Sequence, residues 1–286
     1  MRLSTVTAQR GQMYTPLRYP GGKSRLTGFL TQVIEAGGWT DKEYAEPYAG
    51  GAGAALSLLM AGTVPRIAIN DLDTAIYQFW MAAVEQGQRF SDRILEVPLT
   101  LDEWRSQKLV YKDENADPFD RGFATFYLNR TNRSGVLHAG VIGGQKQQGD
   151  YLIDARFNRS ELSKRVLAIA DRADDISITN LDGVDFIRDK LSENAFIYAD
   201  PPYYEKGALL YLNAFDDGAH GTLAQVLNQH PSGIWLLTYD DCVEIRDLYR
   251  GRYQGTFELP YSAHRSVRAS ELMVMSTPVR KAMDRA

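Results

Sequence analysis

The sequence predicts an α/β protein built on a mostly parallel sheet. Short apolar runs that end at a Gly or Asp alternate with segments in which apolar residues recur at helical spacing. The expected strands, in chain order, are residues 43–50, 66–71, 177–182, 194–203, 233–241 and 271–277. The expected helices are residues 52–62, 74–87, 160–173 and 242–251.

Residues 88–158 interrupt this alternation. The stretches DENADPFD and VIGGQKQQGD within them have the polar, Gly-rich composition of loops. We therefore predict that residues 1–87 and 159–286 form one domain, and that residues 88–158 are a small, mostly helical insertion.

Composition limits the classes of protein that this chain can belong to. With 286 residues, of which 44% are hydrophobic, the chain can bury a sizeable core. It contains no apolar run near the roughly 20 residues that span a bilayer, and its N-terminus lacks the apolar core of a signal peptide. A cytoplasmic protein with no membrane partner is expected. A single cysteine, Cys242, and 4 scattered histidines predict no structural metal site.

The net charge of −4 is unevenly distributed along the chain. Residues 1–34 contain basic side chains and no acidic ones, and residues 121–170 contain 8 Lys or Arg against 3 acidic residues. Two locally basic stretches next to chemical motifs favour a nucleic-acid partner. Solvated surface charge is the alternative for either stretch.

The stretch PLRYPGGKSRL, residues 16–26, ends like a phosphate-binding P-loop. A P-loop requires a glycine five residues before Gly22, and Leu17 occupies that position. The preceding residues are polar and contain Pro16, so no hydrophobic strand leads into the loop. A nucleotide hydrolase is excluded, and the loop needs another explanation.

The stretch AEPYAGGAGAALSL predicts a strand that turns through glycines into a helix. Such a turn lets a ligand approach the backbone beside the N–H groups of a helix N-terminus. It lacks the G-x-G-x-x-G spacing of a dinucleotide site, although Asp71 lies where an acid could bind ribose hydroxyls. A nucleoside ligand without a pyrophosphate fits this pattern, and tight packing or a strand-end cap at Asp71 is the alternative.

Asp200-Pro201-Pro202-Tyr203 ends the apolar strand AFIYA. Prolines donate no hydrogen bond, so a carboxylate and carbonyl oxygens form a group of acceptors beside an aromatic ring. This group suits a planar ligand that carries an amine, which is how an enzyme reads a base extruded from a duplex. A Pro-Pro turn with a helix-capping Asp is the alternative.

These motifs occur in a characteristic order: LRYPGGK, YAEPYAGGAG, IND, YLNRTNRSG, DPPY, TYDD and RASELMVM. The order resembles the Dam-type, or α-group, adenine-specific DNA methyltransferases from about residue 16 to residue 277. The resemblance implies a Rossmann-like methyltransferase sheet with helices on both faces, S-adenosylmethionine as the donor, and double-stranded DNA as the partner.

The resemblance also implies a set of donor-binding residues. In the family that the chain resembles, the YPGGK segment covers the donor and the glycine-rich motif lies below it. Separate acidic residues bind the ribose and the adenine amine of the donor. In this chain the implied residues are Tyr19, Gly21, Gly22, Lys23, Glu46, Pro47, Tyr48, Gly50, Gly53, Asp71 and Asp182. Asp185 is a rival to Asp182 for the adenine amine, and Asp182 is preferred because it ends the apolar pattern.

For catalysis the resemblance implies that Asp200 and the Pro201 carbonyl accept both N–H groups of the target amine, with Pro202 and Tyr203 completing the site. Two stretches, YLNRTNRSG and YSAHRSVRAS, contain the residues that are expected to contact DNA. These residues are Arg130, Asn132, Arg133, Arg265 and Arg268. For YLNRTNRSG a turn held by Asn side chains is an equal alternative.

The region expected to recognise the target is short, and the whole chain is acidic. Either the target site is short, or a protein partner from a restriction-modification, defence or phage system contributes affinity. Two other functions stay open from the sequence: methylation of RNA or another amine or amide, and a non-catalytic DNA-binding subunit with the same fold.

Overall fold

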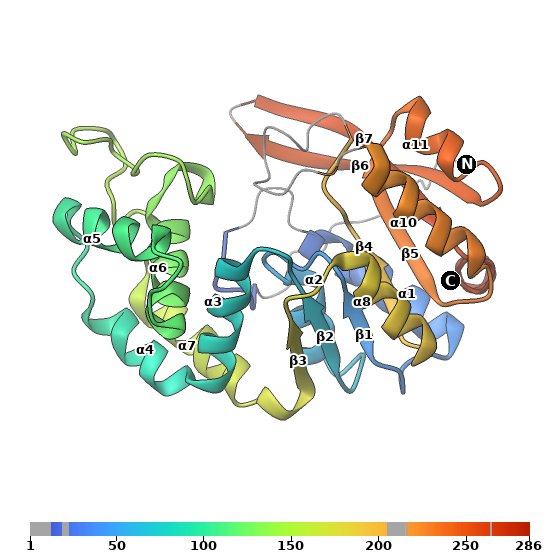
Figure 1. The fold of residues 1–286 in the computed structure, drawn as a ribbon, viewed down its shortest axis with the longest axis horizontal. Helices are drawn as coiled ribbons and strands as arrows, with labels where there is room; N and C mark the ends of the chain where they lie inside the picture. Colours follow the sequence, from blue (N-terminus) through green and yellow to red (C-terminus); the bar gives the residue numbers. More distant parts are fainter. Residues whose placement is uncertain (1–12, 19–22, 205–214, 216, 264) are drawn as a thin grey trace.

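The computed structural model describes residues 13–18, 23–204, 215, 217–263 and 265–286. Its centre is a seven-stranded sheet with the order β3-β2-β1-β4-β5-β7-β6 (Figure 1). The first five strands along the chain are β1 (Tyr44–Glu46), β2 (Ile67–Asn70), β3 (Ile176–Thr179), β4 (Phe196–Ala199) and β5 (Trp235–Asp240). They pair in parallel. The α/β class and the mostly parallel sheet are confirmed.

A long antiparallel hairpin completes the sheet. Its strands are β6 (Tyr253–Ala263) and β7 (Arg265–Met275), and β7 lies between β5 and β6. The expected strand 271–277 is therefore the end of a longer strand, and β6 was not expected from the sequence. In Figure 1 the hairpin extends from one end of the sheet toward the helices at the other end.

Helices cover both faces of the sheet, as expected. On one face lie α8 (Gly183–Ser192), α10 (Asp217–Gln229) and α11 (Val243–Leu248), seen in front of the sheet in Figure 1. The other face packs against α1 (Thr27–Gly37), α2 (Gly53–Met60) and α12 (Thr277–Met283). Strand residues alternate between the two cores, because successive side chains of a strand point to opposite faces: Phe196 packs on one side and Ile197 on the other.

The remaining helices lie beside the β3 end of the sheet in Figure 1. They are α3 (Thr74–Glu85), α4 (Gly87–Glu96), α5 (Leu101–Lys112), α6 (Pro118–Thr131) and α7 (Arg159–Ala170). Rings from three of these helices and from the loop before α7 contact one another: Phe79 of α3 packs on Phe90 of α4 and Phe126 of α6, and Phe157 packs on Phe126. Residues 88–158 therefore share one hydrophobic core with the sheet.

Short 3-10 helices join these elements: η1 (Lys23–Leu26), η2 (Arg133–Gly135) and η3 (Ala173–Asp175). In the part of the chain that the structure describes, no helix is both long and apolar enough to span a bilayer.

Candidate active site

The loop between β1 and α2 follows the first strand at the carboxyl edge of the sheet. Gly50 and Ala52 both adopt left-handed backbone angles, with φ values of 47° and 45°. Glycine accepts this conformation easily, whereas Ala52 requires support from its surroundings. The loop is therefore held in a conformation that surrounding contacts must maintain.

Those contacts come from the end of β2 and from α3. The Gly50 N–H donates to Oδ2 of Asp71 at 2.8 Å, and the Trp80 indole N–H donates to the Gly50 carbonyl at 2.9 Å. The Asn70 amide donates to the Pro47 carbonyl at 3.0 Å. Asn70 and Trp80 had no role assigned from the sequence, yet they fix the loop that carries three of the expected donor-binding residues.

Asp71 holds main-chain amides with both carboxylate oxygens, because Oδ1 also accepts from the Asp73 N–H at 2.9 Å. Burial raises the pKa of Asp71 to about 6, against the lowering effect of these two hydrogen bonds. At neutral pH the carboxylate is ionised and orders the turn after β2.

Glu46 is the last residue of β1 and lies in the interior. Its Oε1 accepts from the Tyr44 hydroxyl at 3.0 Å and from the Ala55 N–H, in the first turn of α2, at 2.9 Å. Burial raises the pKa of Glu46 to about 8. Its carboxyl group therefore ties β1 to the N-terminus of α2.

Tyr48 lies over the start of α8, where the chain leaves β3. A methyl group added at Gly183 would lie 2.3 Å from Cε1 of Tyr48, so only glycine permits this contact. The Tyr48 hydroxyl is buried and has no hydrogen-bond partner among the described residues. A buried hydroxyl without a partner is costly, which marks this position as one where a ligand group would be accommodated.

The two rival aspartates after β3 have different surroundings. Asp182 caps α8 by accepting from the Val184 N–H at 2.8 Å. The pKa of Tyr48 is raised first by the burial of Tyr48 and then by the negative charge of Asp182. Both aspartates are exposed, but Asp185 pairs with Arg188 at 2.6 Å. Asp182 is therefore the aspartate beside Tyr48 and the glycine loop.

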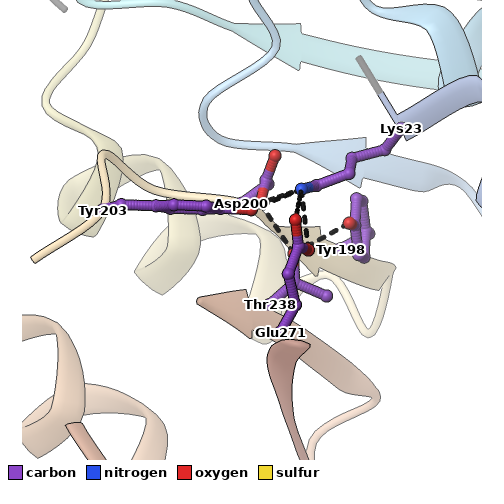
Figure 2. A network of polar contacts seen from close by, with 6 residues as sticks. All are labelled: Lys23, Tyr198, Asp200, Tyr203, Thr238 and Glu271. Carbon is purple, nitrogen blue, oxygen red and sulfur yellow. Dashed lines mark hydrogen bonds and ion pairs between the residues drawn. The ribbon is translucent and has the colours of Figure 1, made fainter. Parts of the chain in front are cut away.

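Asp200 follows β4 and lies at the centre of a polar network (Figure 2). Thr238 of β5 donates to Oδ1 of Asp200 at 2.7 Å, and the Tyr198 hydroxyl lies 2.8 Å from the Thr238 oxygen. Since Thr238 donates to Asp200, Tyr198 donates to Thr238. This chain of hydrogen bonds fixes the orientation of the carboxylate.

Lys23, the first residue of η1, belongs to the same network (Figure 2). Its Nζ lies 3.4 Å from Oδ1 of Asp200 and 3.0 Å from Oε2 of Glu271, and it donates to the Tyr203 hydroxyl. All four side chains are largely or fully buried. Lys23 thus connects the YPGGK segment to the DPPY segment and to β7.

The network leaves Asp200 ionised at neutral pH. Burial raises its pKa to about 6; Lys23 lowers the pKa, Glu271 raises it, and the Thr238 hydrogen bond lowers it. Above pH 6 this carboxylate is therefore an acceptor for a ligand N–H group.

Tyr203 is largely buried, with 9% of its surface exposed, and its ring lies below Lys23. The chain after it is held by Asp240, whose Oδ1 accepts from the Tyr204 N–H at 2.9 Å. Asp240 ends β5 and faces Glu271 of β7 in the sheet register. The end of β5 and the middle of β7 therefore position the DPPY turn.

Thr238, Asp240 and Glu271 were not assigned roles from the sequence. Thr238 and Asp240 lie in TYDD, and Glu271 begins the apolar run LMVM. An acidic residue next to an apolar strand could have indicated a site residue, because a buried carboxylate requires a partner.

The expected DNA-contacting residues separate into two groups. Asn132 is fully buried; it accepts from the Trp104 indole at 2.7 Å and donates to the Leu137 carbonyl at 2.8 Å. Its side chain holds a turn and is not presented to a ligand, so we do not retain it as a DNA contact. Arg130 is partly buried and Arg133 is exposed.

Several expected residues lie outside what the structure describes. Tyr19, Gly21 and Gly22 are outside the described residues, and so are the side chains of Arg265 and Arg268. Within the described ranges, no three His, Cys, Asp or Glu side chains are grouped in a way that could hold a metal ion.

The family model of the D12 class N6 adenine-specific DNA methyltransferases matches residues 19–266. The chain belongs to this family. Membership of the D12 class supports adenine methylation of DNA as its activity, and the sheet is consistent with a Rossmann-like methyltransferase. A search of the curated proteins finds no match. In this D12-class chain, Asp200 and the glycine loop follow adjacent parallel strands, β4 and β1.

Proposed function

We propose that this chain transfers a methyl group from S-adenosylmethionine to the N6 amine of an adenine that is extruded from double-stranded DNA. The observation that carries the proposal is the buried Asp200, oriented by Thr238 and Lys23, directly next to the strand that leads into the glycine loop. An oriented acceptor for an amine and a ligand-binding loop thus lie at neighbouring strand ends, where open α/β sheets bind ligands.

The donor site is proposed at the loop after β1. Glu46, Pro47, Gly50 and Gly53 would form its floor, with Asp71 at the ribose and Asp182 at the adenine amine. The unpartnered hydroxyl of Tyr48 supports this assignment, because it is a buried polar atom beside Gly183 and under the influence of the Asp182 charge. When bound, the donor supplies a methyl group that its sulfonium charge has already activated.

Lys23 would serve both ends of the site. The YPGGK segment, with Tyr19, Gly21 and Gly22, is proposed to bind the donor, and Lys23 reaches from this segment to Asp200. Lys23 would therefore link the donor site to the placement of the catalytic carboxylate.

The Asp200 carboxylate and the Pro201 carbonyl would accept the two N–H groups of the adenine amine. The nitrogen lone pair of adenine is delocalised into the ring, so the amine attacks poorly until its nitrogen becomes tetrahedral. Two acceptors held on one side favour that geometry and stabilise the positive charge that develops on the nitrogen. Pro202 and Tyr203 would complete the pocket for the flipped base.

Glu271 and Thr238 act in this proposal as positioning residues. The ammonium of Lys23 is shared between Asp200 and Glu271, so Glu271 determines where the ammonium lies and how strongly it stabilises ionised Asp200. Thr238 fixes Oδ1 of Asp200 and leaves Oδ2 for the substrate.

Recognition of the target sequence is proposed for residues 88–158, which include α5 and α6. Arg130, Arg133, Arg265 and Arg268 are proposed to contact the DNA. Because residues 88–158 form a small region, the target is either short or is selected together with a protein partner.

The proposal is tested by incubating the purified protein with labelled S-adenosylmethionine and either duplex DNA or total RNA. Label is expected in DNA, on the N6 position of adenine, and not in RNA. Label in RNA alone, or donor binding without any transfer to DNA, would contradict the proposal.

A further inference from the structure

Four arginines from different parts of the chain gather around residues 15–18. They are Arg18 itself, Arg130 in the last turn of α6, Arg156 before α7, and Arg165 within α7. Arg165 donates to the Thr15 carbonyl at 3.1 Å, and Arg18 donates to the Asn132 carbonyl at 3.1 Å. Arg130 makes a long contact of 3.5 Å with the Pro16 carbonyl. We call these four residues the arginine cluster.

Within the part of the chain that the structure describes, no ion pair neutralises their positive charges. None of the ion pairs found among the described residues involves a member of the arginine cluster. The pKa of Arg130 is lowered to about 9, first by burial and then by Arg18, Arg165 and Arg156. The pKa of Arg18 is lowered by burial and by Arg156. No acidic residue is among the causes that act on either group.

The cluster also contains an unused donor. Nε of Arg130 is buried and has no hydrogen-bond partner among the described residues. A guanidinium group carries several N–H donors in a fixed plane, and the contacts to Thr15, Pro16 and Asn132 occupy few of them. Holding like charges together with unused donors is unfavourable unless an anion accepts from them.

We propose that Arg18, Arg130, Arg156 and Arg165 form a binding site for a phosphate group of the DNA backbone. Guanidinium groups match phosphate oxygens in geometry and charge, and backbone phosphates are the anions that the proposed substrate brings to the protein. This inference rests on the proposed function only for the source of the phosphate.

The position of the cluster along the chain agrees with this role. Arg18 and Lys23 are 5 residues apart in sequence, so at most roughly 18 Å separates their Cα atoms. Lys23 contacts Asp200, the proposed acceptor for the target amine. A phosphate held at Arg18 would thus belong to a nucleotide within a few steps of the flipped base. Such a contact fixes the register of the DNA without reading its sequence.

The test uses the double variant Arg156→Gln, Arg165→Gln. Arg156 is exposed and Arg165 is partly exposed, so the fold is expected to survive, whereas Arg130 is more deeply placed. The matched control is the double variant Arg188→Gln, Arg250→Gln, which removes the same charge from two exposed arginines that are paired with Asp185 and Asp247. Binding of fluorescein-labelled duplex DNA is followed by anisotropy at several salt concentrations.

The double variant is expected to bind DNA on the order of tenfold more weakly at low salt. The slope of log affinity against log salt should be smaller by roughly one, and equally so for duplexes of different sequence. The control variant should match the wild type. Wild-type affinity and slope in the double variant would overturn the proposal, as would the absence of DNA binding by the wild type.

A second measurement separates a DNA phosphate from a free one. Inorganic phosphate is titrated while thermal unfolding is followed for the wild type and the double variant. Stabilisation of the wild type alone, with unchanged DNA affinity in the double variant, would assign the cluster to a free phosphate and overturn the proposal. Failure of the proposed function would be seen separately, as no methyl transfer to DNA by the wild type.

Discussion

Two groups of charged residues in this molecule are organised in opposite ways. In the network around Asp200, one ammonium lies between two carboxylates and a tyrosine hydroxyl, so charges of both signs contact one another. In the arginine cluster, four guanidinium groups meet without any carboxylate among the described residues. The first group contains charges of both signs, whereas the second contains positive charges with no counter-ion among the described residues.

Because of this difference, substitutions in the two groups should have different effects. A buried network that contains charges of both signs holds the Asp200 carboxylate in one geometry. Its loss should therefore affect the chemical step and the dependence of that step on pH. An unbalanced cluster attracts an anion, so its loss should affect binding and its dependence on salt. The predictions below test whether the two kinds of effect can be separated, beginning with the largest.

Replacing Asp200 by Ala should give the largest effect. Without the carboxylate acceptor, methyl transfer to DNA is expected to fall by about 10²- to 10⁴-fold. Affinity for S-adenosylmethionine, measured by calorimetry, should stay near the wild-type value, and DNA binding should keep its salt dependence. Loss of donor binding together with activity would show that Asp200 supports the donor site. Effects on the chemical step and effects on binding would then not be separable.

The pH dependence of transfer should respond in opposite directions to the two partners of Asp200. Because Asp200 must be ionised and has a pKa of about 6, the rate should rise with pH through about 6. Glu271→Gln removes a negative charge and should move this rise to lower pH. Lys23→Met removes a positive charge and should move it to higher pH, each on the order of one pH unit.

The exposed carboxylate of Glu244, in α11, provides the control for these rate profiles. Glu244→Gln changes the net charge as Glu271→Gln does and should leave the midpoint unchanged. An identical midpoint in all the variants would show that the rate does not report the ionisation of Asp200.

Gly183→Ala should weaken the donor site without touching either charged group. The added methyl group would lie 2.3 Å from the Tyr48 ring and displace it, at a cost of about 1 to 3 kcal/mol. Donor affinity should fall on the order of tenfold. Gly28→Ala, in α1, is the control, because a methyl group there meets no atom within 4 Å. Equal donor affinity in both variants would contradict the placement of the donor beside Tyr48.

The last prediction concerns stability and not methyl transfer: the free energy of unfolding of Glu46→Gln is measured at two pH values. The pKa of Glu46 in the folded protein is about 8, above its ordinary value of 4.5. The stability that the protonated form contributes is complete below pH 4.5 and is lost as pH rises through 8. Relative to the wild type, the variant should therefore gain about 4 kcal/mol between about pH 5 and pH 8.5. A constant difference across this range would contradict the raised pKa.

The sequence was sufficient to predict the parts of the fold that repeat a simple pattern. Four of the five parallel strands, β1, β2, β4 and β5, are short runs buried on both faces, and each ends near a glycine or an acid that the structure places at the same edge. The edge strand β3 is partly exposed. The glycine loop and DPPY turn follow directly from this arrangement. Strand β6 could not be found in this way, because Gly255 and Pro260 interrupt its apolar pattern.

The parts of the site that the sequence did not predict depend on contacts between distant segments. Glu271 meets Lys23 across 248 positions of the chain, and Thr238 meets Asp200 only because β5 pairs with β4. Asn132 shows the reverse case. In a run of Asn and Arg it resembles a surface contact, but its burial beneath Trp104 makes it a support for the turn.

The most direct test of the central claim is sequencing of native DNA after expression of the wild type and of Asp200→Ala in a host that lacks adenine methylation. We expect N6-methyladenine at one short recurring sequence with the wild type and none with the variant. Equal methylation by both proteins, or none by a wild type that binds S-adenosylmethionine and DNA, would contradict the assignment of Asp200 as the acceptor for the target amine.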